Sequence, residues 1–120
     1  LLAGEVVTTG AQTTVNLVDG GTAVSHVPTT AADMGLKVNI GVRPEDLVLS
    51  TGAGLFTGTV EIVEALGEVT LLYFGEEMGA PHMIAKLPGI HADLRRQRVT
   101  LTADPAKVHL FAGGRSLLYR

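Results

Sequence analysis

The sequence has 120 residues, enough for one domain that buries roughly two thirds of the surface its unfolded chain exposes. Its 46% hydrophobic content excludes a disordered chain, and the absence of cysteine excludes a disulfide scaffold. A net charge of −3 provides no broad basic surface for phosphate backbones. No apolar run approaches the roughly 20 residues of a membrane-spanning helix, and no signal peptide is visible.

The first residues already have the character of a strand. The chain begins with Leu1, Leu2 and Ala3 and not with Met, so we expect an excised part of a longer protein.

Further along, apolar and polar residues alternate over 14–17, 37–42 and 98–102. Alternation with a period of two is typical of strands that place one face toward a core.

Residues 68–74 differ because both faces of the predicted strand are apolar. Leu71 and Tyr73 share one face, whereas Leu72 and Phe74 share the other. Such a strand is either central in a barrel or sandwich, or covered by a partner. The sequence leaves both possibilities open.

Turn and helix signals are short. Glycine-containing turns are predicted at 19–21, 50–52, 88–89 and 113–115. Single helical turns are predicted where Pro44 follows an extended Arg43 and where Asp104 caps a turn that begins at Pro105. Residues 60–66 favour a strand over a helix because of their β-branched content, and 91–97 remain a candidate short helix.

These elements predict an all-β fold of short antiparallel strands, in a small barrel or sandwich, with at most one-turn helices. We expect one domain over residues 1–120. Because residues 50–55 are small and glycine-rich, we expect possible lobes at 1–50 and 55–120, and no clear sequence repeat relates them.

No pattern indicates catalysis, a cofactor or a metal. The nucleotide-binding pattern G-x-x-x-x-G-K-[ST] is absent, and the glycines at 52, 54 and 58 do not form a dinucleotide fingerprint. The histidines at 26, 82, 91 and 109 lack ligand spacing. Glu61 and Glu64 face opposite sides of a strand, and Glu76-Glu77 are predicted to lie in a hairpin loop. We expect Arg95, Arg96 and Arg98 to lie in a solvent-exposed loop. A nucleic-acid-binding surface would have aromatic residues between the basic ones, and this segment has none.

Three segments in order are more specific than the rest. They are VNIGVRPEDL at 38–47, VEALG at 63–67 followed by TLLY at 70–73, and DPAKVHLF at 104–111 followed by GRSL at 114–117. Together they resemble the C-terminal region of the ATPase subunits of carbohydrate-importing ABC transporters, of the maltose and glycerol-phosphate type. The resemblance covers essentially the whole chain. It departs from the family at Ala112, where an acidic residue is common.

The resemblance implies a transport-associated OB (TOBE) domain, in which non-contiguous segments form small OB-like β-barrels. It implies a non-catalytic regulatory and dimerisation role, with ATP and Mg²⁺ bound by an upstream ATPase domain and no cofactor in this part. The implied partners are that ATPase domain, a second copy of the subunit, the membrane subunits and a cytoplasmic regulator such as the glucose-specific enzyme IIA of the phosphotransferase system. The implied location is the cytoplasmic face of the bacterial inner membrane, without nucleic acid.

Eight residues are candidates for an interface or a structural motif. They are Arg43, Pro44, Glu45, Glu64, Gly67, Leu72, Phe74 and His109. The Arg43 guanidinium is expected to reach Glu45 or Glu64, either at an interface or at a structural corner. Gly67 is expected to supply a positive-φ turn in which a β-carbon would clash.

Two alternative functions remain. Domains of this class are similar to modules that bind molybdate or other oxyanions, and residues 8–10 and 29–30 offer hydroxyl and amide donors for a small ligand. An OB-fold nucleic-acid binder rests on fold analogy alone.

Overall fold

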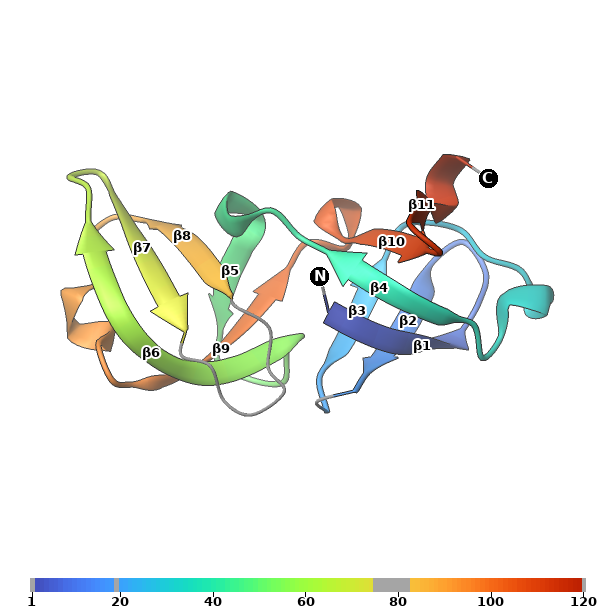
Figure 1. Ribbon diagram of the computed structural model, residues 1–120, viewed down its shortest axis with the longest axis horizontal. Helices are drawn as coiled ribbons and strands as arrows, with labels where there is room; N and C mark the ends of the chain where they lie inside the picture. Colours follow the sequence, from blue (N-terminus) through green and yellow to red (C-terminus); the bar gives the residue numbers. More distant parts are fainter. Residues whose placement is uncertain (1, 19, 75–82, 120) are drawn as a thin grey trace. The chain divides into compact units, whose positions relative to one another are not determined.

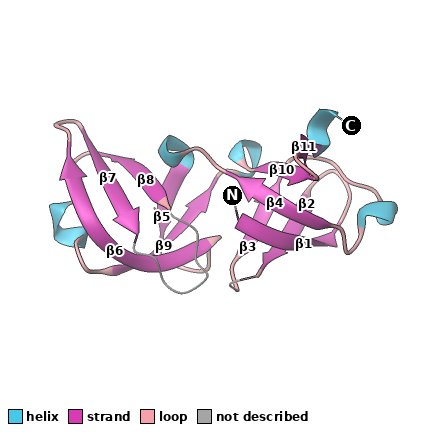
Figure 2. Cartoon of the chain, in the orientation of Figure 1, coloured by secondary structure: helices cyan, strands magenta, loops and turns pink. Residues whose placement is uncertain are grey.

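A computed structural model describes residues 2–18, 20–74 and 83–119. Within them, the structure consists of strands and a few three-residue 3-10 helices (Figures 1 and 2). The predicted all-β fold with one-turn helices at most is confirmed. The elements are β1 (Leu2–Thr8), β2 (Thr13–Leu17), β3 (Thr22–Ser25), η1 (Ala31–Asp33), β4 (Lys37–Gly41), η2 (Pro44–Asp46), β5 (Leu47–Ser50), β6 (Phe56–Ala65), β7 (Val69–Phe74), β8 (Ile84–Pro88), η3 (Ala92–Leu94), β9 (Arg98–Ala103), η4 (Pro105–Lys107), β10 (His109–Ala112), β11 (Arg115–Ser116) and η5 (Leu117–Tyr119).

Most local predictions agree with this order. Residues 60–66, which favoured a strand over a helix, lie largely in β6. Single turns form at η2 and η4, and the Asp104 carboxylate accepts a hydrogen bond from the Ala106 amide at 2.9 Å. The candidate helix at 91–97 is only the three-residue η3. Glu76-Glu77 and His82 lie outside the described residues.

The chain divides into two compact units, each built on one curled antiparallel sheet (Figure 1). Unit 1 comprises Leu1–Val42 with Ala103–Arg120, and its strand order is β11-β10-β4-β1-β2-β3. Unit 2 comprises Arg43–Thr102, with the order β5-β9-β6-β7-β8. Unit 2 is therefore a continuous segment inserted into unit 1.

A structural repeat that the sequence did not reveal explains this division. The order strand-strand-strand-η-strand-η-strand occurs over residues 2–50 and again over 56–112. In each repeat the last strand joins the sheet of the other repeat, because β5 pairs beside β9 and β10 pairs with β4. The predicted division near residues 50–55 falls between the two repeats, whereas the compact units have other bounds because these strands are exchanged.

The first strand of each repeat carries a glycine in the middle of its inward face. Gly4 lies between the buried residues Leu2 and Val6, and Gly58 lies between Phe56 and Val60. A Cβ atom at Gly4 would lie 2.7 Å from the Asn16 carbonyl oxygen, and one at Gly58 would lie 2.8 Å from the Phe56 ring. The close approach that glycine permits lets each short strand curl around its small core.

Buried polar side chains in unit 1 are all satisfied within the described residues. The Ser25 hydroxyl donates to the Val108 carbonyl at 2.6 Å and so joins the end of β3 to the segment before β10. The Thr13 hydroxyl donates to the Val27 carbonyl at 2.6 Å. In unit 2, Phe56 and Phe74 pack edge to face with ring centroids 5.2 Å apart. The hydrogen bonds in unit 1 and the aromatic pair in unit 2 thus help to fix the two cores.

Candidate interaction surface

The predicted corner at Arg43 is a backbone feature. Arg43 is extended, with φ −68° and ψ 146°, and its carbonyl accepts a hydrogen bond from the Asp46 amide at 2.9 Å. Arg43, Pro44 and Glu45 are exposed. Among the described residues, no ion pair joins Arg43 to Glu45 or to Glu64. The structure therefore exposes these three side chains to solvent.

Gly67 forms the turn between β6 and β7. Its φ of +90° lies in the region that favours glycine, as predicted. The expected clash is wrong, because a Cβ atom there would meet nothing within 4 Å. The backbone angle alone makes glycine favourable at this turn, which the Leu66 amide closes by donating to the Val69 carbonyl at 2.9 Å.

The two-faced strand is central in unit 2. β7 lies between β6 and β8, with Leu72 and Phe74 buried on the inner face. Leu71 and Tyr73 are half-buried on the outer face. Glu64 is exposed near the end of β6, and His109 is exposed on β10 in unit 1, paired with Gly41. Within unit 2, the buried Leu72 and Phe74 and the exposed Glu64 therefore do not form one cluster.

The residues that do lie together are on the outer face of β6, β7 and β8. The strand register places Ile62 opposite Tyr73, and Tyr73 opposite Ile84. In the next row, Glu64 lies opposite Leu71, and Leu71 opposite Lys86. Ile62 is 58% exposed and Ile84 is 39% exposed. We call these six residues the β6–β8 outer face. Sequence reasoning found only Glu64 and the Leu71–Tyr73 face of β7.

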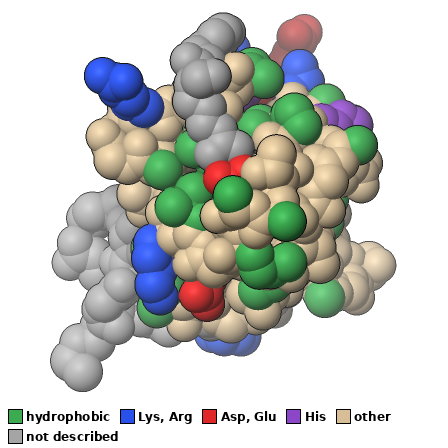
Figure 3. All heavy atoms as spheres, turned by 90° about the vertical axis from the view of Figure 1, so that its right-hand side faces the viewer, with side chains coloured by type: hydrophobic (Ala, Val, Ile, Leu, Met, Phe, Trp, Pro, Cys, Tyr) green, Lys and Arg blue, Asp and Glu red, His purple; other side chains and the backbone are tan. Residues whose placement is uncertain are grey.

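Acidic and basic side chains are both present on the face of the molecule that Figure 3 draws. Figure 3 shows basic side chains that are separated by uncharged surface on this face and do not merge into one patch. A nucleic-acid-binding surface normally has a continuous basic groove. This face does not have that character.

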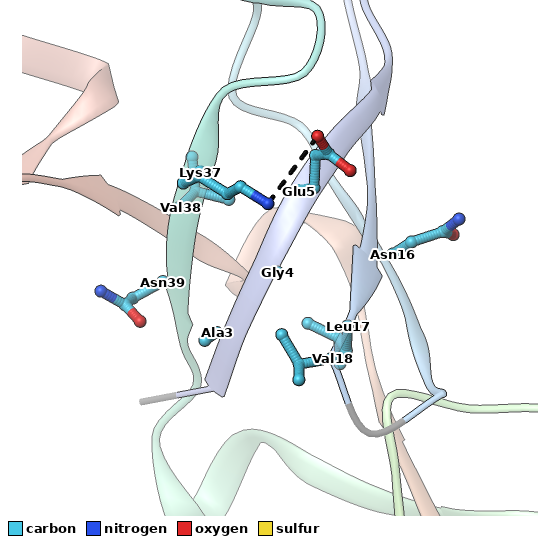
Figure 4. Close-up of a pocket in the computed structure, with 9 residues that line it drawn as sticks. All are labelled: Ala3, Gly4, Glu5, Asn16, Leu17, Val18, Lys37, Val38 and Asn39. Atoms are coloured by element: carbon cyan, nitrogen blue, oxygen red, sulfur yellow. Dashed lines mark ion pairs between the residues drawn. The ribbon is translucent and has the colours of Figure 1, made fainter.

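A hollow of about 380 Å³ lies over β1, β2 and β4 in unit 1 (Figure 4). Lys37 Nζ and Glu5 Oε1 approach to 4.0 Å across it, and both side chains are largely exposed. The Asn16 and Asn39 side chains point away on opposite sides (Figure 4). These polar groups do not converge on one point, so the hollow lacks the arrangement of a small-ligand site.

Two further features were searched for over residues 2–18, 20–74 and 83–119. No group of three or more His, Cys, Asp or Glu side chains is placed to hold a metal ion. No helix in this part of the chain has the length and apolar character needed to cross a membrane.

The two curled antiparallel sheets define an all-β protein of small OB-like barrels. The solved structure of the cytoplasmic molybdate-binding protein ModG, with molybdate bound, is similar in fold, with a TM-score of 0.63. The match covers 91% of this chain and 92% of that chain at 14% sequence identity, and it shows the fold alone.

The chain belongs to the TOBE domain family, whose model matches residues 40–111. It is 47% identical over 112 residues to the alpha-glucoside transport ATP-binding protein AglK of Rhizobium meliloti, covering 92% of this chain and 31% of the relative. It is 34% identical over 91 residues to the sn-glycerol-3-phosphate import ATP-binding protein UgpC of Rhodopseudomonas palustris, covering 61% of this chain and 25% of the relative. It is 33% identical over 98 residues to the maltose/maltodextrin import ATP-binding protein MalK of Vibrio vulnificus, covering 81% of this chain and 26% of the relative. The chain thus spans about a third or less of these relatives.

Proposed function

We propose that the chain is the non-catalytic regulatory and dimerisation domain of the ATP-binding subunit of a bacterial ABC importer for a carbohydrate. The observation that carries the proposal is the 47% identity over 92% of the chain to an alpha-glucoside transport ATP-binding protein. Relatives named for glycerol phosphate and maltose import support the same class of transporter.

The residues of the chain fit a role that involves no chemistry of its own. The sequence has no nucleotide-binding pattern, so ATP and Mg²⁺ are assigned to another part of the subunit. In the parent protein the domain acts at the cytoplasmic face of the inner membrane. There it meets its own ATPase domain and a second copy of the subunit, and it contacts the membrane subunits through the ATPase domain. A cytoplasmic regulatory protein is a further partner.

Sequencing the coding region immediately before Leu1 tests the proposal directly. We expect G-x-x-x-x-G-K-[ST] and a later L-S-G-G-Q in the same reading frame. The subunit they encode is expected to hydrolyse ATP, and the 120-residue chain alone is not. A start codon close to Leu1, with no such motifs before it, would contradict the proposal.

Oxyanion binding is the alternative, and it rests on likeness of fold to a molybdate-binding protein at 14% identity. Isothermal titration of the chain with molybdate, tungstate and sulfate separates the two functions. We expect no heat of binding with any of them, whereas a saturable titration with molybdate would favour the alternative.

A further inference from the structure

The β6–β8 outer face can be compared with the equivalent strands of the other repeat, β1, β2 and β3. In both repeats a β-bulge interrupts the first strand, between Val6 and Thr8 in β1 and between Val60 and Ile62 in β6. Beyond the bulge, unit 1 carries a row in which Thr8 lies opposite Thr14, and Thr14 opposite Val24. The equivalent row in unit 2 is Ile62, Tyr73 and Ile84. The same backbone is therefore built with a largely polar outer row in unit 1 and an apolar outer row in unit 2, so the apolar row is not a requirement of the fold.

The arrangement of charge on this face is complementary to itself. The apolar row is symmetric about β7, with an isoleucine on each side of Tyr73. The next row is antisymmetric, with Glu64 on one side of Leu71 and Lys86 on the other. A two-fold axis lying in the contact plane along β7 would bring β6 of one copy over β8 of the other. Glu64 of each copy would then oppose Lys86 of the other, with the apolar row between the copies.

An axis across the strands does not give this match. It would exchange the two rows and bring Glu64 toward the apolar row of the second copy, which would leave its carboxylate without a cation. Either axis keeps the strands of the two copies aligned, as packed sheets require, so it is the charge match that selects the axis along β7.

We infer that the β6–β8 outer face packs on the same face of a second copy of this chain, about a two-fold axis along β7. The inference rests on the proposed function, which includes a second copy, and it specifies the surface and the symmetry. Three short strands offer less than the roughly 800 Å² per partner of a standard interface, so the isolated chain associates weakly.

Disulfide trapping detects such a weak contact, and the chain has no native cysteine to interfere. Leu71 lies next to the proposed axis, so Leu71→Cys is expected to form a dimer linked through its own symmetry mate. Val18→Cys is the matched control, since Val18 is an apolar residue of unit 1 that is 85% exposed. Equal rates of cross-linking for the two variants would overturn the inference.

Charge reversal then tests the symmetry in the Leu71→Cys background. Glu64→Lys places two lysines opposite each other at both contacts, and Lys86→Glu places two glutamates there. Each variant alone is expected to cross-link about tenfold more slowly, because both ion pairs become repulsive. Mixing the two variants, one of them isotopically labelled, is expected to restore the rate through mixed dimers. A purely structural role of either residue within one chain predicts no such rescue, and its absence would contradict the proposed axis.

Exposed Lys107 of unit 1 provides the charge control, since Lys107→Glu is expected to leave the rate unchanged. If Leu71→Cys fails to trap a dimer while the upstream region encodes an active ATPase, the surface is wrong and the proposed function stands. If the upstream region encodes no ATPase, the proposed function fails, and the cross-linking still reports on this chain alone.

Discussion

The two repeats build the same backbone from different residues, and their comparison separates what the fold requires from what it leaves open. Both require glycine on the inward face of the first strand, at Gly4 and Gly58. Both have a turn before the fourth strand in which a residue with positive φ donates its amide to the first strand. That residue is Gly35, bonded to Val6 at 2.9 Å, in one repeat and Arg96, bonded to Val60 at 2.7 Å, in the other. The second repeat thus keeps the same turn geometry although arginine, unlike glycine, is unfavourable at a positive φ.

The inward glycines give the largest expected difference between the repeats. Gly4→Ala should lower the free energy of unfolding of unit 1 by about 3 kcal/mol, because the new Cβ atom would meet backbone. Gly58→Ala should cost unit 2 only about 1.5 kcal/mol, because the Phe56 ring that it meets can move. Urea unfolding, followed by backbone amide NMR for each unit separately, measures both values. Equal losses would show that the two strands are constrained in the same way.

The positive-φ turns should respond in opposite directions. Gly35→Ala is expected to destabilise unit 1 by about 1 kcal/mol, since φ at this position is +81°. Arg96→Gly is expected to stabilise unit 2 by about 0.5 kcal/mol, because relieving the cost of φ +67° for a residue with a side chain outweighs the entropy that glycine adds to the unfolded chain. The same unfolding experiment applies. A loss of stability in Arg96→Gly would show that the arginine side chain makes a stabilising contact.

The one-turn helices η2 and η4 give the smallest effect. Asp104 caps η4 through its carboxylate, whereas Arg43 at the matching position of η2 makes no side-chain cap. Asp104→Ala should cost about 0.5–1 kcal/mol, and Arg43→Asp should gain a few tenths, about 0.3 kcal/mol. Thermal unfolding measures both changes, with the exposed variant Glu45→Ala as a control expected to have little effect. A gain in Asp104→Ala would mean that the cap does not stabilise the turn.

The sequence predicts the fold class well because the evidence for it is local. Alternation at 14–17, 37–42 and 98–102 and the prolines at 44 and 105 identify strands and single turns that form where expected. The family resemblance also follows from contiguous segments. These features depend on near neighbours in the chain, which a single sequence displays.

The repeat and the β6–β8 outer face depend on distant or irregular features. The equivalent turns contain Gly35 in one repeat and Arg96 in the other, so comparison of residue types alone conceals their relation. A period of two assigns Val60 and Ile62 to the same face of β6. The bulge between them breaks this period, so that Val60 is buried and Ile62 is exposed. The regular alternation Val60-Glu61-Ile62 gives no sign of the bulge in the sequence.

The insertion of unit 2 into unit 1 sets the order in which the chain can fold during synthesis. All strands of unit 2 have been made once β9 leaves the ribosome, so this unit can close while the chain is still growing. Strand β4 must wait for β10, which lies beyond the whole inserted unit. Until then β4 has one open edge, and a neighbouring nascent chain can pair with it. Early folding of unit 2 shortens the effective distance between β4 and β10, and so it limits the time in which this error can occur.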